Sequence, residues 1–422
     1  MSIEPAWVPD AMWWHVYPLG FTGAPVRPAS ESERALTHRL RHLEAWLDHV
    51  VGLGLNGLLL GPIFASDTHG YDTVDYFRID PRLGDDADLD RLVAACHARG
   101  VRLVLDGVFN HVSRAHPAAH DLSQQGEVFE GHESLVVLDH SSPAIADLVT
   151  EVMLHWLDRG IDGWRLDAAY ALPPAFWQRV LPRVREQYPD AWFLGEVIHG
   201  DYPAIVAASG MDTVTQYELW QGIWHGISDH NFFETVHALQ RHDEMLASFV
   251  PATFVGNHDV TRIASAVGHD LVPHALAVLL TVAGTPSIYA GDELGMTGVK
   301  EERLGGDDAV RPMFPAEPPS PEALGDDPVW RAHRELVGVR RRHPWLRTAR
   351  TDVVHVANGS LVLRTGTGDG AIVTVLNIDG ERVTLPAADA TAVLAGAADL
   401  DDGERAVTLP AHGWAVLGTG AG

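Results

Sequence analysis

The chain has 422 residues, of which 46% are hydrophobic and 21% are charged, as is ordinary for a soluble protein with one large core and a small second one. Its 30 basic and 57 acidic residues give a formal net charge of -27, and the resulting field repels phosphate backbones and anionic lipid surfaces. This balance excludes nucleic acid and membrane partners from the prediction. The acidity is interpreted as a solvated surface.

The beginning of the chain and its cysteine content indicate a cytoplasmic protein. The start, MSIEPAWVPDAMWW, lacks the basic and apolar segments of a signal peptide, and no later apolar run is long enough to cross a bilayer. Cys96 is the only cysteine, so neither an intrachain disulfide nor a cysteine zinc site can form. Its context, LDRLVAACHARG, predicts a buried position on a helix.

Short apolar, β-rich runs alternate with longer amphipathic ones over the first 345 residues. Helical patterns include the one from Arg34, which ends at Gly52 or Gly54, and PAIADLVTEVMLHWLDRG, which ends at Gly160. In chain order, the runs that predict strands are those near Trp13, from Leu55, from Val101, before Asp167, before Glu196, from Met211, before Asp259 and from Thr285. These eight alternations predict an α/β fold, a (β/α)8 TIM barrel with its active site at the carboxyl ends of the strands.

From about residue 346 the pattern changes to alternating apolar and polar residues between turns. The segments DVVHV, SLVLRTG, AIVTVLNI, RVTLP and AVTLPAHGWAVL predict antiparallel strands. We therefore expect a barrel over residues 1–345 and a structural C-terminal β-sandwich over residues 346–422.

Acids follow some of the predicted barrel strands. GWRLDAA places Asp167, WFLGEV places Glu196 and TFVGNHD places Asp259 at strand ends. A carboxyl group at the end of a buried strand is costly to desolvate unless it is paired, so acids at several such ends indicate a shared site. A single acid of this kind is more often a helix cap or an ion-pair partner.

Four segments resemble the conserved regions of the α-amylase family of glycoside hydrolases. They are DGVFNH, GWRLDAA, FLGEV and FVGNHD, in the order of the family. Within the family, HGYDTVDYFRID and GTPSIYAGDELGMTG are most similar to the cyclomaltodextrinase, neopullulanase and maltogenic amylase group. Members of that group usually carry an N-terminal β-domain, which we expect to be absent because the first predicted strand begins about a dozen residues in. The excursion after the third strand, which forms a separate domain in the family, is short here, at about residues 112–139.

The strand-end acids suit the cleavage of a glycosidic bond with retention. This reaction needs a carboxylate that attacks the anomeric carbon and a carboxylic acid that protonates the leaving oxygen. Asp167 suits the first role, because Arg165, two positions earlier on the strand, projects to the same side and would keep Asp167 ionised. Glu196 suits the second role, because the apolar run WFLG before it favours the protonated acid. By resemblance, Asp259 is the third acid, which grips sugar hydroxyls and favours the transition state.

The resemblance also implies contacts with the sugar that is cleaved. It assigns hydrogen bonds to His111 and His258, and a stacking contact to Tyr71. A lone histidine is usually structural, but His111 and His258 each adjoin a predicted catalytic strand end, which favours the functional role. For Tyr71 the stacking role is likewise favoured over a place in the core. Asp67 and Arg311 resemble a pair that closes around the non-reducing end.

Other residues near these motifs are expected to support the site rather than to react. Asp106 is expected to orient Arg165 or the neighbouring backbone. Asn110 occupies a position that binds calcium in many relatives, but because the excursion is short we predict no metal. No organic cofactor is implied.

The segment QYELWQGIWHGISDHNFFE, after the sixth strand, places aromatic residues near the predicted mouth of the barrel. They could be stacking platforms for the leaving side of an oligosaccharide, or contacts with the next helix or another subunit. The aromatic residues are Trp220, Trp224, Phe232 and Phe233.

The favoured function is a retaining hydrolase of α-glucosidic bonds, mainly α-1,4, in maltooligosaccharides or related small α-glucans. Its partner is the oligosaccharide substrate, and self-association into a homo-oligomer is compatible with the sequence. A transglycosylase or sugar isomerase with the same acids is the alternative. A non-catalytic binding barrel is a third hypothesis, against which the presence of the acids, Arg165 and both histidines argues.

Overall fold

The computed structural model describes residues 4–303, 305–387, 389–401 and 405–420. The chain divides into two compact units: residues 1–215 with 311–318, and residues 216–310 with 319–422. These units do not follow the predicted domain boundary at residue 345, which stays a prediction. Among the described residues, no helix has the length and apolar character needed to cross a membrane.

The first unit is built around parallel strands that follow one another in the order β11, β10, β9, β5, β2, β1. Their side chains are buried at almost every position, as is typical of parallel strands covered on both faces. Each strand lies within a run from which the sequence predicts a strand. The bounds are β1 Trp13–Val16, β2 Gly57–Leu60, β5 Arg102–Gly107, β9 Gly163–Leu166, β10 Trp192–Gly195 and β11 Thr213–Val214.

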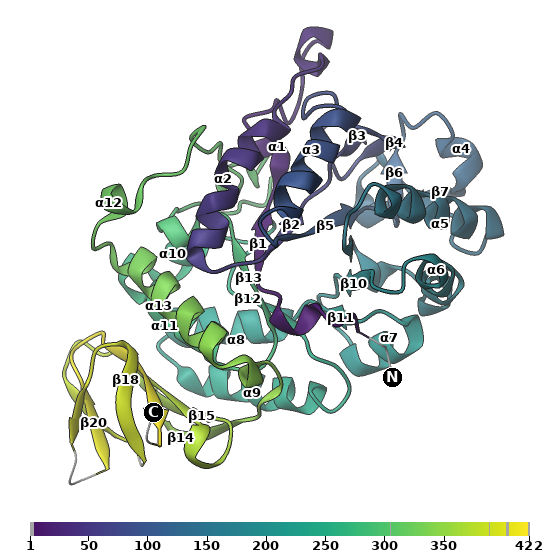
Figure 1. The fold of residues 1–422 in the computed structure, drawn as a ribbon. Helices are drawn as coiled ribbons and strands as arrows, with labels where there is room; N and C mark the ends of the chain where they lie inside the picture. Colours follow the sequence, from purple (N-terminus) through teal and green to yellow (C-terminus); the bar gives the residue numbers. More distant parts are fainter. Residues whose placement is uncertain (1–3, 304, 388, 402–404, 421–422) are drawn as a thin grey trace. The chain divides into compact units, whose positions relative to one another are not determined.

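Helices follow these strands and pack beside one another, as Figure 1 shows for α2 and α3. The bounds are α1 Pro18–Phe21, α2 Leu40–Leu53, α3 Asp86–His97, α5 Pro143–Asp158, α6 Pro174–Gln187 and α7 Tyr202–Ser209. Helix α2 begins later than the amphipathic pattern and ends, as predicted, at Gly54, whose φ of 93° suits glycine. Cys96 lies on α3 and is fully buried, which confirms its predicted position, and burial raises the pKa of its thiol to about 12.

The excursion after β5 is short, as predicted. Strand β8 lies between β6 and β7 in a small antiparallel sheet. The bounds are β6 His111–Ser113, α4 Ala119–Leu122, β7 Ser123–Val128, the 3-10 turn η3 Phe129–Gly131 and β8 Leu135–Leu138. A hairpin of β3 (Phe64–Ser66) and β4 (Thr73–Ile79), absent from the predicted strands, follows β2.

The second unit begins with two helices, α8 (Tyr217–Ser228) and α9 (Phe232–Met245), that lie side by side (Figure 1). Glycines of α8 permit this approach, because a Cβ at Gly222 or Gly226 would collide with side chains of α9. Strands β12 and β13 follow and pair in parallel. The bounds of the next elements are β12 Ala252–Phe254, α10 Ile263–Val267, α11 Val272–Thr281, β13 Thr285–Tyr289, α12 Pro321–Leu324 and α13 Pro328–Arg342.

The rest of the second unit is an antiparallel β-sandwich. In the described part of the chain, one sheet has the order β14, β15, β16, β21, β18 and the other the order β17, β20, β19. Apolar side chains of both sheets, such as Val375 and Val407, share one buried cluster. The bounds are β14 Thr351–Val356, β15 Ser360–Thr365, β16 Ile372–Asn377, β17 Val383–Pro386, β18 Ala390–Gly396, β19 Asp399–Asp401, β20 Ala406–Leu409 and β21 Trp414–Thr419.

A buried histidine links α11 to the sandwich. The Nε2 atom of His274 lies 3.1 Å from the carbonyl oxygen of Asn377 and 3.2 Å from that of Gly413, and donates to them. Burial lowers the pKa of His274 to about 4, below the usual value of 6.5. The unfolded chain therefore binds a proton that the folded chain does not, between pH 6.5 and pH 4.

We expect His274→Gln to flatten the pH dependence of stability. The contribution of neutral His274 is complete above pH 6.5 and is lost as the pH falls toward 4, by up to about 3 kcal/mol. The difference in the free energy of unfolding between the native chain and the variant should therefore shrink on acidification, as measured by urea titration at pH 7.5, 5.5 and 4.5. His237→Gln, at an exposed position of α9, is the control. A difference that stays constant with pH would contradict the expectation.

Candidate active site

Arg165, on β9, lies at the centre of the acids in the first unit. Its Nη1 lies 2.5 Å from Oδ2 of Asp106 and 3.1 Å from Oδ1 of Asp167, and its Nη2 lies 2.7 Å from Oε1 of Glu196. The acids come from or directly follow β5, β9 and β10, which are neighbours in the sheet. Arg165 thus contacts Asp167 as predicted. Asp106 contacts Arg165 rather than only the backbone, and its orienting role stays a prediction.

The charges in this cluster do not balance, because one guanidinium serves several carboxyl groups. Burial opposes the charge of Arg165, but Asp106 and Glu196 outweigh it and hold the arginine pKa well above its usual value. Burial also raises the pKa of Asp106 to about 6, although Arg165 opposes the shift. The excess of acid therefore favours a proton on Asp106 as the pH falls toward 6.

The backbone after Asp167 turns toward Glu196. Ala168 has a φ of 46°, in the left-handed region that residues with a side chain seldom adopt. Its N–H donates to Oε2 of Glu196 at 3.0 Å. Glu196 is thus held by Arg165 on one oxygen and by this N–H on the other, in surroundings more polar than the run WFLG predicts.

Tyr71 and His111 are joined to the same cluster. The Tyr71 hydroxyl donates to Oδ2 of Asp106 at 3.0 Å, and the Tyr71 carbonyl oxygen accepts from Nε2 of His111 at 2.9 Å. The Asn110 amide donates to Nδ1 of His111 at 3.2 Å. Burial lowers the pKa of His111 to about 4, so the ring is neutral. Both ring nitrogens of His111 therefore have partners within the protein, and its predicted hydrogen bond to a sugar stays a prediction.

The short excursion also contributes to this region, through residues that the sequence analysis did not single out. The Phe129 ring stacks on His111 with ring centroids 4.4 Å apart and an angle of 14°. The Tyr170 hydroxyl, just after Asp167, donates to Oε1 of Glu130 at 2.7 Å. The sequence offered no periodic signal for these loop contacts.

Asp67 and Arg311, which the resemblance pairs with each other, have different partners in the structure. The Arg34 guanidinium donates to the Asp67 carbonyl oxygen at 2.9 Å and lies 3.4 Å from its carboxyl oxygen. Arg311 lies over the Tyr17 ring at 4.7 Å and over the Tyr71 ring at 6.0 Å from the centroid. The structure thus adds Arg34 and Tyr17 to the candidate residues, and closure of Asp67 and Arg311 around a sugar stays a prediction.

In the second unit, Asp259 follows β12 on a tightly bonded loop. Its N–H donates to Oδ1 of Asn257 at 2.8 Å, and its carboxyl oxygen lies 3.0 Å from Nε2 of the fully buried His258. The Asn257 amide donates to the Tyr217 hydroxyl at 2.8 Å. The two predicted site residues of this unit therefore contact each other.

A buried ion pair supports the same loop. Nη1 of Arg262 lies 2.8 Å from Oδ1 of Asp292, and both side chains are almost fully buried. A Cβ at Gly256 would approach Oδ2 of Asp292 to 2.5 Å, so glycine is needed there. Burial raises the pKa of Asp292 to about 7, although Arg262 opposes the shift. This pair could not be predicted from the sequence, because its members lie in separate segments.

The structure separates the aromatic residues after the sixth strand into different environments. Phe232 is fully buried, whereas Phe233 is 51% exposed and lines a hollow between α8 and α9. Trp220 and Trp224 instead line a cavity together with Asp259. Phe232 is therefore a core residue, and the two tryptophans are the aromatic residues of this segment that lie in one cavity with Asp259.

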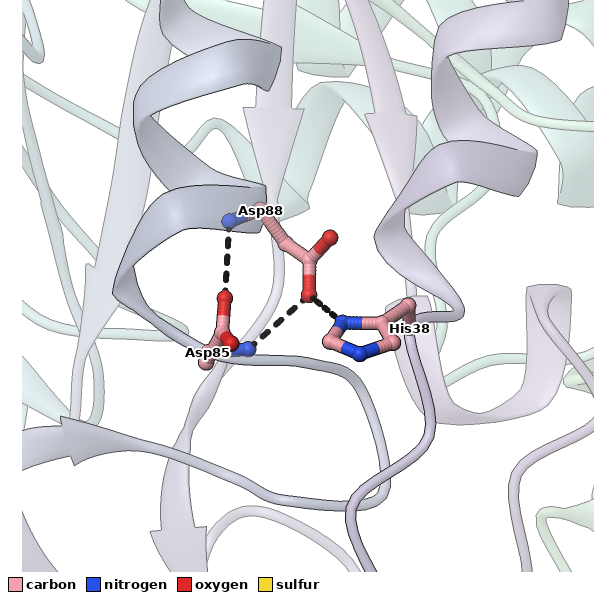
Figure 2. A group of neighbouring side chains, drawn as sticks. All are labelled: His38, Asp85 and Asp88. Atoms are coloured by element: carbon pink, nitrogen blue, oxygen red, sulfur yellow. Dashed lines mark hydrogen bonds and ion pairs between the residues drawn. The ribbon is translucent and has the colours of Figure 1, made fainter.

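His38, Asp85 and Asp88 lie close enough to suggest a cation site (Figure 2). The Asp85 and Asp88 side chains instead accept from each other's backbone N–H in a capping box at the start of α3. Nδ1 of His38 and Nη2 of Arg91 each lie 2.5 Å from Asp88. Burial opposes the charge of Asp88, but these hydrogen bonds outweigh it and lower its pKa. The group is a helix cap held by His38 and Arg91.

Comparison with known families decides the class of this site. The model of the α-amylase catalytic domain matches residues 32–128 and 123–353, which is most of the chain. The chain belongs to the α-amylase family. The predicted enzyme class, a glycoside hydrolase of the α-amylase type, is confirmed.

Members of the α-amylase family with established names are similar along most of the chain. A cyclomaltodextrinase of a Bacillus species is 30% identical over 389 residues, covering 82% of this chain and 68% of that protein. Neopullulanase 2 of Thermoactinomyces vulgaris is 30% identical over 436 residues, covering 90% of this chain and 71% of that protein. These relatives come from the group that the sequence motifs indicate.

A solved α-amylase family structure supports the fold. The ligand-free cyclic α-maltosyl-(1→6)-maltose hydrolase of Arthrobacter globiformis matches with a TM-score of 0.81 and 24% identity, covering 98% of this chain and all of that one. The predicted fold class is confirmed: a (β/α)8 barrel with a short excursion after the third strand and a C-terminal antiparallel β-sandwich.

Proposed function

We propose that the protein is a retaining hydrolase of α-glucosidic bonds, mainly α-1,4, in maltooligosaccharides or related small α-glucans. The observation that carries the proposal is the guanidinium of Arg165, which contacts both Asp167 and Glu196 at the ends of neighbouring strands. A nucleophile and a proton donor on adjacent strands are the pair that retaining hydrolysis requires. The names of the relatives, cyclomaltodextrinase and neopullulanase, support small α-glucans as the substrate class.

In the proposed mechanism, Asp167 attacks the anomeric carbon while Glu196 donates a proton to the leaving oxygen. A glucosyl ester on Asp167 results, and the leaving sugar departs. Glu196, now ionised, takes a proton from water, and the water attacks the same carbon to restore the original configuration. Arg165 beside Asp167 favours the ionised carboxylate for the attack, and it also holds Glu196 next to the nucleophile, where that side chain must carry a proton before the leaving oxygen departs.

Asp259 is the third acid of this proposal and holds hydroxyls of the reacting sugar, with His258 beside it. Tyr71, His111, Asp67 and Arg311 complete the proposed substrate contacts. The carboxyl pair and water are a complete set of reactants, so the proposal includes no organic cofactor and no metal. A cytoplasmic location is part of the same proposal.

The test is a product analysis with maltotriose. We expect glucose and maltose as the main products, and proton NMR at early times should show the new reducing end as the α-anomer. A β-anomer would contradict retention. If the products were mainly longer or isomeric sugars, the hydrolase proposal would be wrong and the transglycosylase or isomerase alternative would be supported.

A further inference from the structure

The second unit contains a cavity beside Asp259 that the mechanism does not use. Its volume is about 410 Å³, within the range typical of small-molecule sites. Trp220 and Trp224 of α8 form one wall, and Thr261, Lys300 and Asp259 supply polar groups.

The aromatic wall is held in place by its neighbours. The Trp220 ring stacks on Phe254, the last residue of β12, with centroids 6.2 Å apart and an angle of 20°. The Tyr217 ring meets Trp220 edge-on at 5.7 Å, and the Trp224 ring lies 5.9 Å from that of Trp220. Because a barrel strand supports the wall, a ligand would find the rings already positioned.

The polar groups of the cavity suit a sugar better than other ligands of this size. The Lys300 backbone N–H donates to the Thr261 hydroxyl at 3.1 Å, which fixes the loop that carries the ammonium group. Asp259 and Glu302 add negative charge, which disfavours a phosphate or a carboxylate. A pyranose ring offers an apolar C–H face to tryptophan and hydroxyls to the surrounding charged groups, so both kinds of lining are satisfied.

We propose that this cavity binds a glucosyl unit of the oligosaccharide other than the unit being cleaved, with Trp220 and Trp224 as its stacking residues. The inference rests on the proposed function, since Asp259 holds the neighbouring sugar in that scheme. The two tryptophans thereby determine how strongly the enzyme prefers longer chains over short ones.

The experiment compares two substrates in Trp220→Ala and Trp224→Ala. Maltopentaose fills several sugar positions, whereas α-glucosyl fluoride has one ring and reaches none beyond the reacting position. We expect the ratio of kcat/KM for maltopentaose to kcat/KM for α-glucosyl fluoride to fall about ten-fold or more in each variant. Trp220→Phe keeps an aromatic face and should restore most of the ratio.

Phe233→Ala is the matched control, because Phe233 is an exposed aromatic residue of the same segment that lies outside this cavity. It should leave the ratio unchanged. An unchanged ratio in both tryptophan variants, or an equal fall in Phe233→Ala, would overturn the inference. So would a changed sedimentation coefficient in the tryptophan variants, which would make the aromatic wall a contact between subunits.

A measurement of binding without turnover tests this inference independently of the proposed function. Calorimetric titration of Asp167→Asn with maltopentaose, with and without Trp220→Ala, measures the cavity without turnover. Weaker binding in the double variant supports the sugar site in this cavity, whether or not the native enzyme hydrolyses either substrate. Absence of hydrolysis by the native enzyme would overturn the proposed function but not this inference. Equal binding overturns the cavity whatever the native enzyme does.

Discussion

Asp167→Asn should lower kcat on maltotriose by at least about 10⁴-fold, because the amide cannot attack the anomeric carbon. The amide is nearly the same size as the carboxyl, and its oxygen can still accept from Arg165, so the fold should persist. With α-glucosyl fluoride the variant should release no burst of fluoride, since no glucosyl ester forms. Steady-state kinetics and a fluoride electrode measure these two results.

The control for this variant is Asp162→Asn, at the opposite end of the same strand. Asp162 directly precedes β9, and its carboxyl lies 2.7 Å from Nη1 of Arg102. Acids at the amino ends of barrel strands contribute to stability rather than to chemistry. We expect this variant to keep kcat within about two-fold while its Tm falls. Turnover by Asp167→Asn close to that of Asp162→Asn would refute the assignment of the nucleophile.

The loss of activity in Glu196→Gln should depend on the leaving group of the substrate. A sugar needs a proton to leave, so kcat on maltotriose should fall by about 10²- to 10⁴-fold. Fluoride leaves without a proton, so the variant should still release a burst of about one fluoride per enzyme molecule when α-glucosyl fluoride is mixed with it. Turnover after the burst should be slow, because no carboxylate activates water.

Azide tests the second half of this scheme. It attacks the glucosyl ester without a general base, so added azide should speed turnover of the Glu196→Gln variant and yield α-glucosyl azide. Asp212→Asn is the control, since its carboxyl accepts the Phe193 N–H at the other end of the strands. The same loss on maltotriose and on the fluoride, with no burst and no azide effect, would exclude Glu196 as the proton donor.

The sequence predicts the strands and their acids well because buried parallel strands read as continuous apolar runs. Asp167 and Glu196 therefore lie where the runs GWRL and WFLG place them. The contact of Arg165 with Glu196 could not be predicted in the same way. The alternation along one strand shows that Arg165 faces Asp167, but only the register between β9 and β10 brings its second nitrogen to the neighbouring acid.

Loop contacts and weakly patterned strands were beyond the sequence analysis for a different reason. Asp67 has Arg34 as a partner through a loop whose path no periodicity describes. Strand β18 is rich in alanine and has only Val393 and Leu394 as large apolar residues, so its pattern indicates a strand weakly. Its pairing with β21 supplies the hydrogen bonds that hold it.

The one thiol of the chain has a use that is independent of catalysis. Cys96 is a fully buried residue of α3, and its high pKa keeps it in the unreactive protonated form while the helix stays in place. Because the chain has no other cysteine, the rate at which a thiol reagent labels the native protein measures how often α3 opens locally and exposes Cys96. Cys96 is thus a native reporter of local opening in the first unit, and no probe has to be introduced.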